Sequence, residues 1–259
     1  MDCVQVYIKK FDEIRLLALM AEDNSNPGGN IVALNALTRA GLVLLSGYFE
    51  GFIREMSKEF VEEINDACLI PSSLPLRMLS EHALTCAEKI KQNKIQPFNE
   101  LINNIQNSSP IQMDSSKLSA TNANPTVDTI ERIFANFDLP LVLDDLSITD
   151  YSLESMYNLE SQIPGNTRKL IIHSVGGDYS KGEEIINIIE AKWSPKKKRR
   201  RIGYLGVIDE IFKKRNRIAH GEGFDEVTPQ ELWDATDAME RLCTGLVNKL
   251  RNKLSSLNC

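Results

Sequence analysis

The sequence predicts a chain built mainly of helices. Apolar residues recur every three or four positions over residues 30–67, and the same period marks residues 202–212 and the stretch that follows Thr228. This spacing places side chains on one face of an amphipathic helix. Residues 170–175 leave the choice open, because a short apolar run also fits a strand or the edge of an apolar loop.

Turn signals separate the expected helices of the first half. These helices cover residues 3–21, 30–67, about 76–91 and a segment that Pro97 opens. Residues 106–125 are rich in Ser, Asn and Pro and are expected to form a loop. Asp128 and Glu131 then give a capping-box pattern that starts a short helix.

The second half is less regular until its last helix. Helices are expected at about residues 150–162 and over residues 182–193. The closing helix is marked by Thr228 as N-cap, Pro229 at the first helical position and Glu231 completing a capping box. Its apolar stripe is expected to face the core or a second copy of the chain.

Composition limits the kind of protein this can be. At 259 residues, with 42% apolar and 25% charged residues, the chain is long enough to bury a core and ordinary for a soluble globular protein. Five scattered cysteines, with neither metal spacing nor an export signal, predict a reducing cytoplasm. The sequence contains no glycine-rich phosphate loop and no zinc pattern, so we expect neither a cofactor nor a metal.

Positive charge is concentrated in one stretch. Residues 190–220 hold eleven Lys or Arg against three Asp or Glu, whereas the whole chain carries a net charge of −6. Six consecutive basic residues open the densest part: Lys196, Lys197, Lys198, Arg199, Arg200 and Arg201. Such a run can follow a nucleic-acid backbone, direct nuclear import or remain a solvated tract. Its place just before the helix at residues 202–221 favours phosphate binding.

The end of that helix carries the residues that look suited to chemistry. Lys213, Lys214, Arg215, Asn216 and Arg217 form a polar block, after which Ile218 and Ala219 are expected to return to the core. His220 follows, and Gly221 is placed to stop the helix. Histidine can move a proton near neutral pH, and arginine can stabilise charge on a phosphate. The pair suits cleavage of RNA through its 2′-hydroxyl, with no metal required.

Spacing decides which of these side chains can act together. Asn216 and His220 are four residues apart and share a helix face, whereas Arg215 and His220 are about 140° apart around the axis. Two copies of the helix facing each other could surround one phosphate. The alternative is that Arg215 and His220 belong only to a solvated helix face.

The run Arg-Asn-Arg-Ile-Ala-His-Gly at residues 215–221 resembles the signature of the HEPN superfamily, an Arg and a His separated by four to six residues. The order of the surrounding segments resembles that of RiboL-PSP-type HEPN proteins, over residues 31–137 and 202–250. The resemblance implies an all-α fold with long antiparallel helices, dimerisation and metal-independent ribonuclease activity, often in bacterial toxin or antiviral systems. Residues of about 140–200 fall outside it and are interpreted as an insertion.

These observations define the expected organisation and function. Residues 1–137 and 202–259 should form the helical bundle, with residues 138–201 inserted between them. The expected catalytic residues are Arg215, His220 and Asn216. The basic run, together with Lys213, Lys214 and Arg217, is expected to bind RNA. Expected partners are RNA, a second copy of the chain and an antitoxin or other defence protein, with no membrane involved.

Two other functions fit parts of the sequence. A non-catalytic helical module that binds RNA or protein is the main alternative. A toxin silenced by nucleotide transfer is disfavoured, because such families resemble one another in a Tyr two residues past the histidine, where this chain has Glu222.

Overall fold

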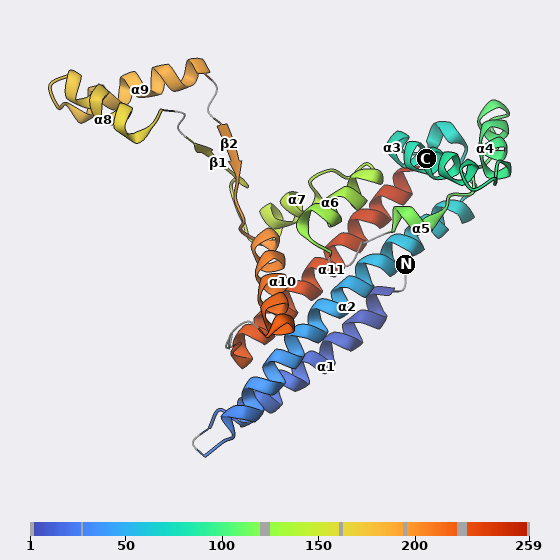
Figure 1. Ribbon diagram of the computed structural model, residues 1–259, viewed down its shortest axis with the longest axis horizontal. Coiled ribbons are helices and arrows are strands. Elements are labelled where there is room, and N and C mark those ends of the chain that lie inside the picture. The colour runs from blue at the N-terminus through green and yellow to red at the C-terminus, as the bar shows by residue number, and fades with distance from the viewer. Residues whose placement is uncertain are drawn as a thin grey trace. The chain divides into compact units, whose positions relative to one another are not determined.

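The computed structural model describes residues 3–26, 28–119, 125–160, 163–193, 196–221 and 227–257. Over these residues the chain forms eleven α-helices, one 3-10 helix and a single pair of short strands, so the expectation of an all-α fold is confirmed (Figure 1). Two compact units can be distinguished. The larger is made of Met1–Leu146 and Gly203–Cys259, and the smaller of Ser147–Ile202.

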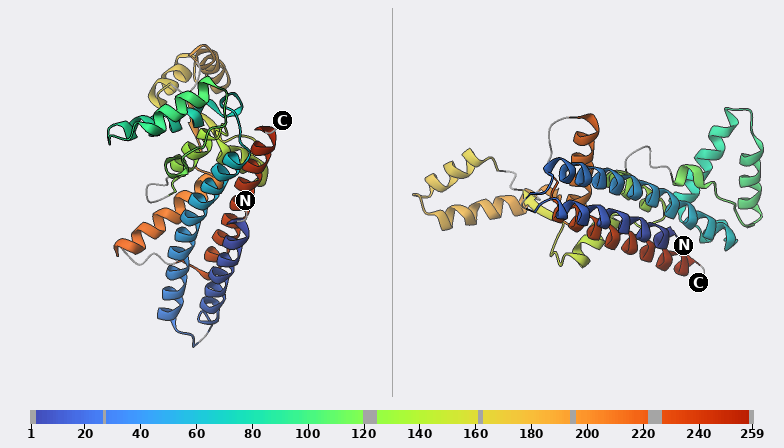
Figure 2. Two further views of the ribbon diagram at one scale, coloured as in Figure 1. Left: turned by 90° about the vertical axis from the view of Figure 1, so that its right-hand side faces the viewer. Right: turned by 90° about the horizontal axis from the view of Figure 1, so that it is seen from below.

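Three long helices form the centre of the larger unit: α1 (Cys3–Asp23), α2 (Ile31–Asp66) and α11 (Pro229–Leu257). They lie side by side in every view (Figures 1 and 2). Helix α1 runs antiparallel to the other two. The Tyr48 hydroxyl donates to Glu13 Oε2 at 2.7 Å, and Arg15 Nη2 donates to Asp237 Oδ1 at 2.7 Å.

Helix α2 owes its length to a cap and a continuous buried face. The Asn30 side chain accepts hydrogen bonds from the amides of Val32 and Ala33, which satisfies two donors at the helix start. Phe49, Phe52 and twelve further residues of α2 are buried. Burying a phenylalanine stabilises a fold by about 1.5–3 kcal/mol, so this face contributes much of the core.

By length and composition alone, α2 is also apolar enough to cross a membrane, a test that core helices of soluble proteins pass as well. Helices α1, α10 (Tyr204–His220) and α11 all pack against it. Through these contacts α2 serves as a core helix of the larger unit.

The closing helix begins as its sequence predicts. Thr228 N donates to Glu231 Oε2 at 2.9 Å, and Glu231 N donates to Thr228 Oγ1 at 3.1 Å, which completes the capping box. Near this end α11 comes close to α2. A Cβ added at Gly41 would lie 2.5 Å from Leu232 Cδ2, so the glycine permits the approach without moving Leu232.

Shorter elements cover one end of the bundle: η1 (Pro71–Ser73), α3 (Leu76–Ile90), α4 (Gln96–Gln106), α5 (Ser115–Leu118), α6 (Val127–Asn136) and α7 (Val142–Asp150). Two expectations need correction here. The loop expected over residues 106–125 contains the one-turn helix α5, and residues 120–124 lie outside the described part. Helix α6 is capped by Thr126, whose Oγ1 accepts from Thr129 N at 3.3 Å, and not by Asp128.

The smaller unit differs most from expectation. Its elements are β1 (Tyr157–Glu160), α8 (Gly165–Ser174), α9 (Tyr179–Trp193) and β2 (Lys196–Arg199). The helix predicted at about residues 150–162 is wrong, because α7 ends at Asp150 and β1 follows. Residues 170–174, left open between a strand and a loop edge, belong to α8, which packs against α9. The tight approach of Gly182 to Ile172 joins the two helices.

Candidate active site

Helix α10 carries the candidate catalytic residues on the larger unit. Tyr204, Leu205, Ile208, Ile211 and Phe212 are buried along one face, and the Phe212 ring lies 6.5 Å from that of Phe49 on α2. This face fixes α10 against the core. It also determines where the polar end of the helix is held.

Arg215 continues the buried face of α10. It follows Ile208 by seven residues and Ile211 by four, so it lies on the same side of the helix. The side chain is accordingly half-buried, and its Nε atom is buried with no hydrogen-bond partner in the described part of the chain. A buried donor left unpaired costs about 1–3 kcal/mol. The single chain therefore holds Arg215 in an incompletely satisfied position.

Asn216 orients the guanidinium group. Arg215 Nη1 donates to Asn216 Oδ1 at 3.0 Å, and both side chains are half-buried. The amide group therefore restricts the directions that the arginine can take. The sequence had suggested that Asn216 shares a face with His220, but it gave no sign of this bond.

His220 is the last residue of α10 and is exposed. Gly221 follows in the left-handed conformation, with φ at 67°, and its N–H donates to the carbonyls of Arg217 and Ile218. The predicted helix stop at Gly221 is thus confirmed. In the described residues no hydrogen bond joins His220 to Arg215 or Asn216, so one copy of α10 brings together two of the three expected catalytic residues.

One expectation about this helix end is wrong. Ile218 and Ala219 were expected to return to the core, yet Ile218 is only half-buried and Ala219 is exposed. The reason is that the α10 residues buried in this chain end at Phe212. The last two turns of α10 are therefore only partly covered by the chain's own elements. Glu222, where related toxins carry a tyrosine, lies outside the described residues.

The cations next to Arg215 differ in their surroundings. Lys213 and Arg217 are exposed, whereas Lys214 Nζ lies 3.2 Å from Glu210 Oε1 and 3.5 Å from Glu231 Oε1. Burial lowers the pKa of Lys214, but its contacts with Glu210 and Glu231 outweigh burial and leave that pKa above its usual value. Lys214 therefore ties α10 to the first turn of α11, which limits its availability to a substrate.

The basic run belongs to the smaller unit, and its first four residues form β2. Strand β2 pairs antiparallel with β1, with Lys198 opposite Asn158 and Lys196 opposite Glu160, and Arg200 N donates to Met156 O at 2.7 Å. Because neighbouring strand residues point to opposite faces, Lys198 and Arg199 lie on opposite faces of the ribbon.

Exposure varies along the basic run. Lys198 and Arg201 are exposed, and Arg199 and Arg200 are half-buried. The side chains of Lys196 and Lys197 lie outside the described part. The pairing with β1 gives the run a fixed backbone from residue 196 to residue 199.

The sequence model of the RiboL-PSP-HEPN family matches residues 6–252. The chain belongs to this family. The match begins in α1, ends in α11 and includes the Arg215 to His220 segment, so the helical bundle and its polar helix end are features of a HEPN domain. No curated protein and no solved structure matches the chain.

Family membership supports a role connected with RNA for this HEPN chain. In the described residues, no three His, Cys, Asp or Glu side chains gather so that they could hold a metal ion.

Proposed function

We propose that this chain is an endoribonuclease that cleaves RNA without a metal, at a site formed by the α10 helices of two copies. The 2′-hydroxyl attacks the adjacent phosphorus, the bond to the 5′-oxygen breaks, and the products are a 2′,3′-cyclic phosphate and a 5′-hydroxyl. One His220 would remove the proton of the 2′-hydroxyl, and the His220 of the second copy would protonate the leaving oxygen. Arg215 would stabilise charge on the phosphate oxygens.

The observation that carries this proposal is the pairing of Arg215 with Asn216 at one helix end. A guanidinium group restrained in one direction loses less conformational freedom when it binds a planar or tetrahedral anion. His220 lies one turn further, at the exposed tip of the helix. The chain thus presents a phosphate-binding group and a proton-transfer group on the same short segment.

The distribution of these groups supports a two-copy site. Arg215 and His220 are about 140° apart around α10, and no hydrogen bond links them in the described chain. Two further observations support a two-copy site. Arg215 Nε has no hydrogen-bond partner among the described residues, and the end of α10 is only partly buried.

Helix α2, which packs against α10, offers a surface for the second copy. Its exposed residues from Ile31 to Gly47 are uncharged: Ile31, Val32, Ala36, Ala40, Val43, Leu44 and Gly47. Such a stripe suits close helix packing.

Binding of RNA would use the basic ribbon of the smaller unit. Lys198, Arg199, Arg200 and Arg201, with Lys196 and Lys197 before them, provide charge for several phosphates. Lys213 and Arg217 would extend this charge beside Arg215, with a smaller part for Lys214 because Glu210 and Glu231 already engage it.

The biological setting we propose is a cytoplasmic toxin or antiviral defence system, in which an antitoxin or other defence protein controls cleavage. The four described cysteines are free thiols, which suits a reducing compartment. A non-catalytic module that binds RNA or protein is the alternative. Arg215 is partly buried, and if this side chain only stabilised the fold, the alternative would be favoured.

The proposal is tested with purified protein and a labelled RNA that contains one preferred cleavage position. Cleavage should proceed in excess EDTA and leave a cyclic phosphate, and replacing the single 2′-hydroxyl at that position by hydrogen should stop it. A dependence on a divalent ion, or cleavage of the 2′-deoxy substrate, would contradict the mechanism. If the protein bound RNA but no preparation of it cleaved RNA, the non-catalytic alternative would be favoured.

A further inference from the structure

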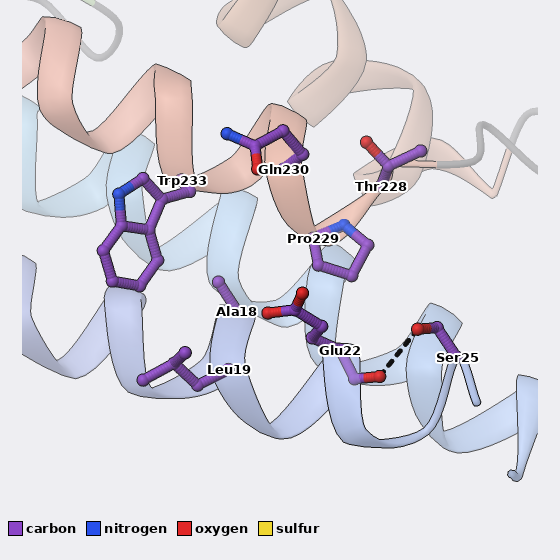
Figure 3. Close-up of a pocket in the computed structure, with 8 residues that line it drawn as sticks. All are labelled: Ala18, Leu19, Glu22, Ser25, Thr228, Pro229, Gln230 and Trp233. Carbon is purple, nitrogen blue, oxygen red and sulfur yellow. Dashed lines mark hydrogen bonds between the residues drawn. The ribbon is translucent and has the colours of Figure 1, made fainter.

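A pocket of about 390 Å³ lies between the end of α1 and the start of α11 in the larger unit. Ala18, Leu19 and Glu22 line it from α1, and Pro229, Gln230 and Trp233 line it from α11 (Figure 3). Leu19 is 47% exposed, whereas Ala18 at the base is 2% exposed. The pocket therefore has an apolar wall that the chain itself leaves uncovered.

Two polar groups of the lining, the Glu22 carboxylate and the Gln230 amide oxygen, are hydrogen-bond acceptors, and the hydroxyls of Ser25 and Thr228 lie beside them. The Glu22 carboxylate points from α1 towards Pro229 (Figure 3), and no hydrogen bond to it is found among the described residues. Gln230 Nε2 donates to Asp234 Oδ1 at 2.8 Å, which leaves the amide oxygen and the second N–H of Gln230 for a ligand. Two acceptors beside an indole ring suit a ligand that carries donors and positive charge.

The residues around the pocket carry a net negative charge. Along the seam of α1 and α11, Arg15 is the cation of a cluster with three carboxylates, Asp12, Asp237 and Glu240. One cation and three carboxylates give this cluster a net charge of −2. The carboxylates of Glu22 and Asp234 add two negative charges, so these six side chains together carry −4. The positive end of the α11 dipole, roughly half a charge, does not reverse that balance. An RNA phosphate would be repelled here.

We propose that this pocket binds an arginine or lysine side chain from a basic segment of a partner protein. The cation would lie on the Trp233 ring with its donors on Glu22 and on the Gln230 oxygen. The exposed Leu16 and Leu19 of α1 would contact the apolar part of the same segment. This surface is separate from Arg215 and His220, so a partner could bind it without occupying the groups proposed for cleavage.

The test uses the full chain with Trp193→Phe, which leaves Trp233 as its single tryptophan. The probe is an acetylated peptide of alternating Gly and Arg, and binding is followed by Trp233 fluorescence. We expect saturable binding that weakens about tenfold or more in Glu22→Gln, as for loss of one charge-assisted hydrogen bond. Asp23→Asn removes the same charge one residue away and should change affinity less than about twofold.

Several outcomes would overturn the proposal. Equal weakening by Glu22→Gln and Asp23→Asn would mean general charge attraction. Equal binding of a peptide with citrulline in place of arginine would exclude a cation site, and displacement of the peptide by guanosine monophosphate would indicate a nucleobase site. Glu22→Gln should cleave RNA as the unsubstituted chain does, so this result is independent of the proposed nuclease activity.

Discussion

Arg215 Nη1 donates a hydrogen bond to Oδ1 of Asn216, its neighbour in the chain, at 3.0 Å. Adjacent residues on a helix point about 100° apart, so the bond requires the long arginine side chain to turn back along its own helix. The guanidinium group is thereby held at the half-buried side of α10, and among the described residues it makes no hydrogen bond to His220 at the exposed tip. In the proposed two-copy site, the second copy of α10 would supply the group that acts with each histidine.

His220→Ala and Arg215→Ala should each lower the rate of RNA cleavage by about a hundredfold or more, the range typical of losing a proton-transfer group or an anion-stabilising donor. Circular dichroism and thermal melting should show an unchanged fold for His220→Ala, because its side chain is exposed. Lys9→Ala is the control, since it removes an exposed cation from α1, outside the proposed site. Full activity of purified His220→Ala would remove His220 from the mechanism.

Asn216→Ala should have a milder effect, about tenfold in kcat, because Asn216 positions the arginine and we expect no direct contact with the phosphate. The loss should appear in kcat more than in KM, as expected for imprecise placement of a group that acts in the transition state. Asn216→Asp keeps the acceptor and should restore the orientation of Arg215 in part. If Asn216→Ala and Arg215→Ala were equally inactive, Asn216 would have to act directly on the phosphate and not through the position of Arg215.

Replacing residues 196–201 with Ser and Gly should flatten the salt dependence of RNA binding. Each phosphate contact on single-stranded RNA contributes about 0.7 to the slope of log affinity against log salt. KM should rise while kcat stays nearly the same, because charge that binds substrate and transition state equally does not lower the barrier. An unchanged slope would show that the ribbon of β1 and β2 serves another purpose, with a partner protein as the next hypothesis.

The sequence predicted those parts of the fold that depend on local patterns. The boundaries of α2 and α11 and the stop at Gly221 follow from apolar spacing and from capping residues, which act within one turn. The smaller unit was predicted poorly because β1 exists only through pairing with β2, almost forty residues further along the chain. Strand β1 alternates apolar and polar residues over Tyr157–Glu160, but four residues are too few for this alternation to outweigh the prediction of a helix.

The same limit applies to the candidate site. Arg215, Asn216 and His220 could be found from their spacing, because all three lie on one helix. Neither the bond between Arg215 and Asn216 nor the burial of Arg215 Nε could be deduced from that spacing, since both depend on rotamers and on the packing of α10. The pocket beside Trp233 was missed because its two sides are about two hundred residues apart in sequence.

A buried histidine makes stability depend on pH. His82 on α3 is 7% exposed, its Nδ1 accepts from Asp114 N at 3.2 Å, and its Nε2 lies 3.5 Å from Cys86 Sγ. Burial lowers the pKa of His82, with a smaller opposing effect of Asp114 and a further lowering by Lys89. The unfolded chain therefore binds a proton more readily at this site, and the free energy of unfolding should fall as pH drops below the usual value of 6.5.

Urea unfolding at about pH 7.5 and about pH 5.5 measures this effect. His82→Asn, which keeps an acceptor for Asp114 N, should show a smaller loss of stability between the two conditions. The pKa of Asp114 is lowered to about 2 by Lys89 and Ser116, so this carboxylate stays charged throughout. His173→Asn, at an exposed position, is the control. Identical pH dependence in His82→Asn would exclude His82 as the source.

The most direct test of the two-copy site mixes the inactive variants Arg215→Ala and His220→Ala. A mixed dimer would contain one site with an intact Arg215 from one copy and an intact His220 from the other. The account predicts that mixing restores part of the RNA cleavage, above the level of either parent dimer and below that of the unsubstituted dimer, because the mixed site has one histidine and one arginine of the two pairs. Light scattering confirms that dimers are present. Mixed dimers that form normally and remain as inactive as either parent would show that each copy uses its own pair of residues, which contradicts the composite site.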